Sequence, residues 1–250
     1  MKVGIIIPCT SKDRDWQTVE QSYLYDTTIK TFALTYNKDY NYTFYIGIDK
    51  NDRIYDNDEN KTKLKRFCSV LKNIDIKFLH MDGIKKGHLT LMWNVLFEAA
   101  YNDQCDYFFQ CGDDIKFTTS GWIDDCIITL KNNNNIGMTG PMNNNDRILT
   151  QSFVSRKHME LFGYFFPPEI INWGCDDWIN LIYKGINAFF PLRHHFCDNI
   201  GGKPRYLINN EKDRFQGRQD MMNMLDKVRN LADDIAKRDI KRINEKLINV

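Results

Sequence analysis

The sequence predicts an α/β protein built on a doubly wound sheet that helices cover on both faces. Short continuous apolar runs alternate along the first half of the chain with segments of helical periodicity. Apolar runs of this kind are typical of strands buried on both faces, and their alternation with helices favours parallel strands joined by right-handed crossovers. The 250 residues are 42% hydrophobic, which suits one large α/β domain or two small ones.

Four strands and three intervening helices are expected in the first half. The strands are predicted at residues 3–7, 43–48, 74–79 and 106–111, and the helices at 16–36, 60–71 and 88–101. The last helix has the clearest pattern, because Leu89, Met92 and Leu96 recur at helical spacing. Ligands of such sheets bind beyond the carboxyl ends of the strands, so the polar residues at 8–14, 49–53 and 112–114 are the first functional candidates.

The second half is less regular. Ser120 is expected to cap a helix that runs to residue 130. Further strands are predicted at 136–142, 148–155 and 188–196, and short helices at 156–162 and 176–183. A long charged helix is predicted over 211–250, with an apolar stripe formed by Met224, Val228, Leu231, Ile235, Ile243 and Leu247.

We therefore place one domain over residues 1–205 and a C-terminal helical extension over 206–250. Two uses of the apolar stripe remain open. It packs on the chain's own domain, or it forms a homodimer.

Composition excludes several classes of protein. The 34 basic and 33 acidic residues leave a net charge of +1, which argues against a protein that neutralises many nucleic-acid phosphates or anionic lipids. No apolar run approaches the ~20 residues of a membrane span, so no transmembrane segment and a cytoplasmic location are expected. The seven dispersed cysteines are expected to be free and buried. Abundant Asn, Ile and Lys suit an AT-rich genome, such as that of a protist or of a large virus, and a viral protein would work in the host cytoplasm.

Asp113 and Asp114 directly follow a buried-type strand, and Gly112 before them permits close backbone approach. Two carboxylates at the end of a strand repel each other unless a cation lies beside them. Mg²⁺ and Mn²⁺ prefer oxygen ligands and are commonly completed by substrate phosphates. The pair therefore predicts a site for a metal and a diphosphate, with an ordinary polar turn as the alternative.

Asp176 and Asp177 open a helix after Trp173 and Gly174. The flanking residues indicate an aromatic-walled pocket, in which a carboxylate can accept the proton of an attacking hydroxyl. Two other pairs, Asp124–Asp125 and Asp233–Asp234, are interpreted as solvated helix faces.

Two adjacent histidines lie on the last predicted strand. Alternation groups His194 with Leu192 and Phe196, and leaves His195 with Arg193 on the more polar face. His195 is therefore preferred as a metal or phosphate ligand, with a packed or surface histidine as the alternative.

The order of these motifs resembles glycosyltransferases of the GT-A fold, close to family-2-type enzymes, over residues 2–200. The segments that carry the resemblance are IIIPCTSKDR, YIGIDKND, LMWN, QCGDDI and NWGCDDWINLIY. The resemblance implies a Rossmann-like, doubly wound mixed sheet. Asp113–Asp114 resembles the DxD motif, although Cys111 stands where a full DxDD pattern has its first carboxylate, so Asp113 would hold the metal and Asp114 would bind it directly or through water. NWGCDD resembles the WGxED motif, which makes Asp177 the catalytic base and puts Asp176 in the place of the usual Glu.

The resemblance also implies donor contacts. Pro8, Thr10 and Arg14 match the first nucleotide-binding loop, and Asp49 matches the acid that contacts base or ribose. Lys86 and Asn94 match polar donor contacts, and Trp173 would stack on a sugar of the acceptor.

The implied activity is a transfer dependent on Mn²⁺ or Mg²⁺. It moves a sugar from a nucleotide-diphosphate sugar, with a UDP-sugar favoured, to a hydroxyl of a glycan, protein or lipid-linked acceptor, with inversion of configuration.

Two other functions stay open. A catalytically degenerate GT-A domain would act as a module that binds carbohydrate or a partner. A sugar nucleotidyltransferase would be expected to carry a Gly-rich loop after the first strand, and IIIPCTSKDRDW has no Gly there.

Overall fold

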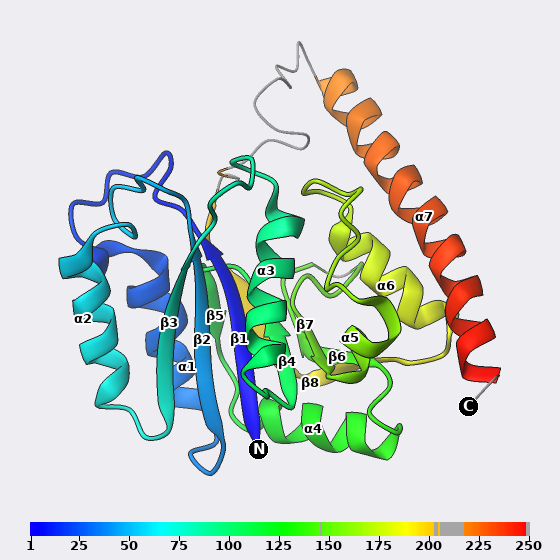
Figure 1. Ribbon diagram of the computed structural model, residues 1–250, viewed down its shortest axis with the longest axis horizontal. Helices are drawn as coiled ribbons and strands as arrows, with labels where there is room; N and C mark the ends of the chain where they lie inside the picture. Colours follow the sequence, from blue (N-terminus) through cyan, green and yellow to red (C-terminus); the bar gives the residue numbers. More distant parts are fainter. Residues whose placement is uncertain (146, 203–204, 206–217, 249–250) are drawn as a thin grey trace.

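A mixed sheet of eight strands carries the fold, in the order β3-β2-β1-β4-β7-β6-β8-β5 (Figure 1). The computed structural model describes residues 1–145, 147–202, 205 and 218–248. The predicted α/β class and the doubly wound mixed sheet are confirmed.

The four strands predicted in the first half are present and parallel. They are β1 (Lys2–Cys9), β2 (Asn41–Ile48), β3 (Ile74–His80) and β4 (Tyr107–Gln110). β1 lies between β2 and β4, and β3 pairs with the outer edge of β2. The carboxyl ends of these strands therefore meet at one edge, which brings the loops after β1, β2 and β4 together.

The second half of the sheet mixes directions. It contains β5 (Ile115–Phe117), β6 (Met138–Met142), β7 (Ser152–Ser155) and β8 (Phe189–Asn199). β7 is antiparallel to β4 and β6, whereas β8 is parallel to β6 and antiparallel to β5. β5 was not predicted, because a strand of three residues is too short to show the alternation of polar and apolar side chains. β7 begins later than predicted because both backbone groups of Leu149 bond the Asn180 side chain instead of a strand.

Helices bury both faces of the sheet. Side chains of β1 alternate between two core clusters, with Ile5 in one and Ile6 in the other. Core residues of α1 (Lys30–Thr35), α2 (Asp58–Ser69) and α4 (Trp122–Asn132) join the Ile5 cluster. Those of α3 (Leu89–Asn102), α5 (Lys157–Phe162), α6 (Cys175–Gly185) and α7 (Arg218–Ile248) join the Ile6 cluster.

The helix predicted over residues 16–36 is interrupted. A 3₁₀ turn, Val19–Gln21, precedes a π-helix, Leu24–Ile29, which continues into α1. The Thr28 hydroxyl in the π-helix donates to the Asp113 carbonyl and accepts from the Ile115 amide, at 2.7 and 3.0 Å. The wider turn thus coincides with a tertiary contact that a hydrophobic pattern does not reveal.

The expected Ser120 cap is wrong. Gly121 precedes α4 at φ 81°, and no side chain caps the helix. This left-handed conformation favours glycine, so the helix begins one residue later than predicted.

The C-terminal helix α7 packs along α6 (Figure 1). Val228, Ile235 and Ile243 of the predicted stripe are buried, whereas Leu231 is 43% exposed. Asp239 is also buried and accepts hydrogen bonds from Tyr164 and Trp178. The buried part of the stripe therefore packs on the chain's own domain. The predicted start of this helix at residue 211 lies outside the described residues. Residue 206, where the C-terminal extension was predicted to begin, also lies outside them.

All seven cysteines are free and buried, as predicted. Within the described residues, no helix has the length and apolar character that would let it cross a bilayer.

Candidate functional site

Two adjoining cavities lie at the carboxyl end of the parallel strands. The first has a volume of about 240 Å³, and its lining includes Pro8, Thr10, Asp113, Asp114 and Arg205. The second has a volume of about 380 Å³, and its lining includes Asp176, Asp177 and Arg147, together with Leu225 and Val228 of α7. Both cavities are lined by Trp93, Asn172 and Trp173. The structure therefore brings the two predicted carboxylate pairs to cavities that share a wall.

Arg205 forms ion pairs with both residues of the first carboxylate pair. Its Nη1 donates to Asp113 Oδ2 at 2.6 Å, and its Nη2 contacts Asp113 Oδ1 as well as Asp114 Oδ2, the latter at 3.3 Å. Asp113 is fully buried, so this bidentate contact compensates a charge that would otherwise be costly. Arg205 was not predicted, because it follows the last predicted strand and belongs to no periodic pattern.

Asp114 is poorly compensated. Burial and the neighbouring Asp113 charge raise the pKa of its carboxyl to about 6. A methyl group added at Gly201 would collide with Asp114 Oδ2, and one at Gly112 would lie 2.5 Å from Oδ1. Glycine at both positions therefore allows the backbone to hold this carboxylate in place, as was expected for Gly112.

The pair fits the divalent cation that the fold implies. One nitrogen of Arg205 contacts oxygens of both carboxylates, so a cation at that point would have an oxygen ligand from each. Hard oxygen ligands suit Mg²⁺ or Mn²⁺. Burial raises the pKa of the Cys111 thiol well above its ordinary value, so this thiol stays neutral and is no ligand for a hard metal.

Asp52, which was not predicted as a site residue, links the loops around Asp113. One oxygen accepts from the Ser11 amide at 2.7 Å and from the Thr10 hydroxyl at 3.3 Å. The other oxygen accepts from the amides of Ile54 and Tyr55. The Tyr55 hydroxyl then donates to Asp113 Oδ2 at 3.2 Å. Asp52 thus fixes the loop after β1 relative to the carboxylate pair.

The second carboxylate pair opens α6. Asp177 forms an ion pair with Arg147, which also lines the cavity and was not predicted. Burial and the adjacent Asp177 charge raise the pKa of Asp176 to about 7. Gly174 precedes the pair at φ 93°, and a side chain there would lie 2.9 Å from the Val228 carbonyl of α7. The sharp turn and the close approach of α7 explain the glycine.

Other predicted donor contacts lie outside both cavity linings. Arg14 donates to the Gly201 carbonyl at 2.7 Å, behind Asp114. Asp49 is buried and lies 4.0 Å from the Lys86 ammonium. The Asn94 amide bonds the backbone of Phe165 and Phe166, so the structure gives it partners within the fold.

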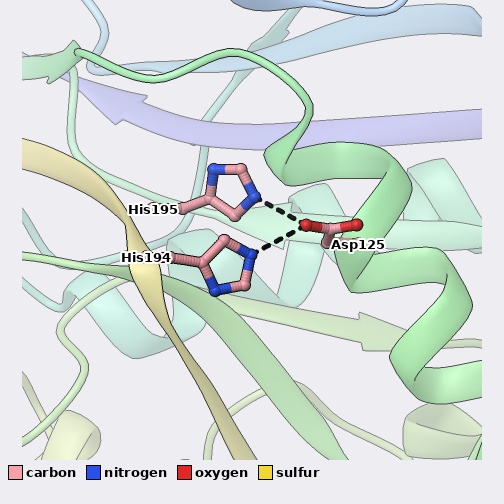
Figure 2. Close-up of side chains that lie close together, drawn as sticks. All are labelled: Asp125, His194 and His195. Carbon is pink, nitrogen blue, oxygen red and sulfur yellow. Dashed lines mark hydrogen bonds and ion pairs between the residues drawn. The ribbon is translucent and has the colours of Figure 1, made fainter.

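His195, predicted as a metal or phosphate ligand, contacts neither residue of the Asp113–Asp114 pair among the described hydrogen bonds. Its ring nitrogens contact Asp125 and Thr119, and the adjacent His194 also contacts Asp125 (Figure 2). The solvated-face interpretation is therefore wrong for Asp124–Asp125, because Asp124 in turn accepts from Asn37 and Tyr40. It is confirmed for Asp233–Asp234, which pair only with Lys237 among the described ion pairs.

The predicted alternation of the histidines is also wrong. His195 is buried, whereas the His194 side chain is 67% exposed, and the register between β6 and β8 shifts between Leu192 and Phe196.

Most of the chain resembles solved structures of S. aureus TarS. The TarS 1-349 complex with UDP-GlcNAc aligns with a TM-score of 0.56 at 11% identity, over 97% of this chain and 72% of that one. The complex with UDP gives a TM-score of 0.54 at 12% identity, over 79% and 60%. Against the longer TarS structure the TM-score is 0.52 at 12% identity, and the match spans 78% of this chain but only 36% of TarS.

These similarities define the fold class. The chain shares a GT-A-like fold with these structures. No protein-family model and no curated protein sequence matches it.

Proposed function

We propose that this chain transfers a sugar from a nucleotide-diphosphate sugar to an acceptor hydroxyl. The observation that carries the proposal is the shared wall of the two cavities, with Asp113 and Asp114 on one side and Asp176 and Asp177 on the other. A donor diphosphate beside the first pair would put its sugar next to a carboxylate of the second. UDP-sugars are the favoured donors, because the structural neighbours include complexes with UDP and UDP-GlcNAc.

The first cavity is the proposed donor site. Asp113 would hold Mn²⁺ or Mg²⁺, with Asp114 binding directly or through water. Such an ion, when bound, supplies positive charge to the departing diphosphate. Arg205 would leave Asp113 and pair with phosphate oxygens, for which a guanidinium is well matched. Pro8 and Thr10 line the same cavity and would contact the nucleotide. Arg14, Asp49, Lys86 and Asn94 remain proposed as donor contacts on the resemblance alone.

The second cavity is the proposed acceptor site. Asp177 would accept the proton of the attacking hydroxyl, and attack from the face opposite the diphosphate would invert the configuration. With its pKa raised to about 7, Asp176 would hold a proton below neutral pH. Trp173 is 37% exposed and lines both cavities, so its ring can stack on a sugar at the junction.

The test is a thermal-shift series with UDP and several UDP-sugars, each with and without Mn²⁺, followed by a UDP-release assay. A ligand that binds the folded chain raises its melting temperature, so the correct donor should stand out. Asp113→Asn should remove the Mn²⁺-dependent shift and lower turnover at least about a hundredfold.

Asp233→Asn is the matched control, since Asp233 belongs to an exposed Asp pair on α7, and it should behave like the wild type. If no nucleotide diphosphate shifts the melting temperature, the proposal is overturned. The better-supported function is then that of a catalytically degenerate domain that binds carbohydrate or a partner. Pyrophosphate release from a nucleoside triphosphate and a sugar phosphate would instead support a nucleotidyltransferase.

A further inference from the structure

We propose that Asp125, His194 and His195 form a second metal site, outside both cavities, for a divalent transition-metal ion such as Zn²⁺. Figure 2 shows both imidazole rings directed at one carboxylate. The Nε2 atoms of His194 and His195 lie 2.9 and 2.8 Å from the same oxygen, Asp125 Oδ2. Ligand atoms of the three residues all lie within 4.8 Å of one another.

These distances suit a small ion after a slight opening. Zinc bonds to imidazole nitrogen and carboxylate oxygen are about 2.0–2.2 Å long, so ligand atoms of a tetrahedral site lie about 3.3 Å apart. The present contacts are therefore a few tenths of an ångström shorter than a loaded site requires. The exposed His194 side chain can move by that amount.

The sheet is built to place both histidines on one side. Consecutive residues of a regular strand point to opposite faces. Here Pro141 of β6 pairs with Leu192 and Met142 pairs with Phe196, so residues 193–195 bulge from the register. The bulge turns His194 and His195 toward the first turn of α4, and bulges often redirect side chains in this way.

A neighbouring hydroxyl orients the buried ring. His195 Nδ1 lies 3.2 Å from Thr119 Oγ1, which also accepts from the Phe196 amide at 3.0 Å. This contact directs His195 Nε2 at Asp125. Metal-bound histidines almost always have such a partner on their second nitrogen.

The donor atoms of the three side chains suit a transition-metal ion. Both imidazoles contact one oxygen of Asp125, so the three side chains already converge on one point. Its neighbour Asp124 is engaged by Asn37 and Tyr40 and does not compete. Two imidazoles and one carboxylate suit Zn²⁺ and leave a fourth position for water, whereas the all-oxygen pair Asp113–Asp114 suits Mg²⁺ or Mn²⁺.

Zn²⁺ binding to the full chain, measured by calorimetry in a non-chelating buffer, tests the site. We expect saturable binding of one Zn²⁺ by the wild type and by Asp113→Asn, with a rise in melting temperature on Zn²⁺ addition. His194→Ala should weaken Zn²⁺ binding at least about tenfold, and Asp125→Asn should do the same. His194 is exposed, so its variant should fold even if a His195 variant does not.

His80→Ala is the matched control, because His80 is also exposed and lies 3.7 Å from a carboxylate, that of Asp56. It should bind Zn²⁺ like the wild type. The proposal is overturned if the wild type shows no saturable Zn²⁺ binding, if His194→Ala and Asp125→Asn bind as tightly as the wild type, or if Asp113→Asn alone removes the binding. None of these outcomes depends on sugar transfer.

Discussion

The guanidinium of Arg205 contacts Asp113 through two nitrogens and reaches Asp114 as well, at the point where the proposed metal of the donor site would bind. One residue thus supplies the positive charge that the buried carboxylates need in the absence of ligand. The same residue must move before a divalent ion can take its place.

Replacing Arg205 by Gln should tighten Mn²⁺ binding, by about tenfold or more, because the metal no longer competes with a buried ion pair. The metal-free variant should melt at a lower temperature than the wild type, since Asp113 loses its buried partner. Mn²⁺ should then raise the melting temperature of the variant by more than it raises that of the wild type. Calorimetric titration and melting curves measure both effects. Arg66→Gln, an exposed arginine on α2, is the control. Unchanged or weaker Mn²⁺ binding in Arg205→Gln would contradict the competition.

Asp177→Asn should lower the rate of sugar transfer by about 10²–10⁴-fold, because the amide cannot accept the hydroxyl proton. Donor binding should stay within a few-fold of the wild type, since Asp177 lines only the acceptor cavity. Single-turnover transfer and UDP-sugar calorimetry separate the two quantities. Full transfer activity in this variant would refute the role of Asp177 as the base, and product of retained configuration would refute inversion.

Asp176 should make the fold less stable as pH rises. Its pKa is about 7 in the folded chain and lies near 3.8 when exposed, so between these values the unfolded state has lost a proton that the folded state still binds. Stability from this group therefore falls as pH increases from about 4 to about 7, and is constant above that.

Asp176→Asn removes this penalty. The variant should gain stability over the wild type at pH 8 but not at pH 4, with each pKa unit worth about 1.4 kcal/mol before water in the cavity reduces it. Denaturant unfolding at the two pH values measures the difference. An equal effect of the substitution at both pH values would show that Asp176 is ionised at neutral pH.

Trp173→Ala should reduce kcat/KM for the acceptor by about tenfold, because the ring stands at the wall common to both cavities. Trp173 is 37% exposed, so the free energy of unfolding should fall by about 1–2 kcal/mol, less than the ~3–5 kcal/mol that truncating a fully buried tryptophan costs. Steady-state kinetics with varied acceptor, together with an unfolding curve, check the two expectations. A stable variant with unchanged kcat/KM would remove Trp173 from the acceptor site.

Much of the fold could be predicted because it rests on local patterns. Continuous apolar runs located β1, β2, β3 and β4, and the carboxyl ends of these strands pointed to Asp113 and Asp114. The motif around Trp173 located Asp177 at a second cavity. Such signals lie within a few residues of one another along the chain.

The remaining site residues depend on tertiary contacts. Arg205 reaches Asp113 across 92 positions of sequence, and Arg147 reaches Asp177 across 30. No period marks either arginine. The partners of His195 were missed because strand alternation assumes a regular register, and the bulge at 193–195 breaks it. Asp125 was interpreted as a solvated helix residue, because its partners come from a strand about 70 residues further along the chain.

The seven buried thiols give the chain a built-in set of unfolding probes. Cys9, Cys111 and Cys126, the last a residue of α4, belong to the core cluster of Ile5, whereas Cys175 begins α6 and belongs to the cluster of Ile6. Burial raises the pKa of each of these four thiols, so they react slowly with alkylating reagents while the fold is closed. Pulsed alkylation read by mass spectrometry would therefore report which part of the molecule opens first, without any engineered label.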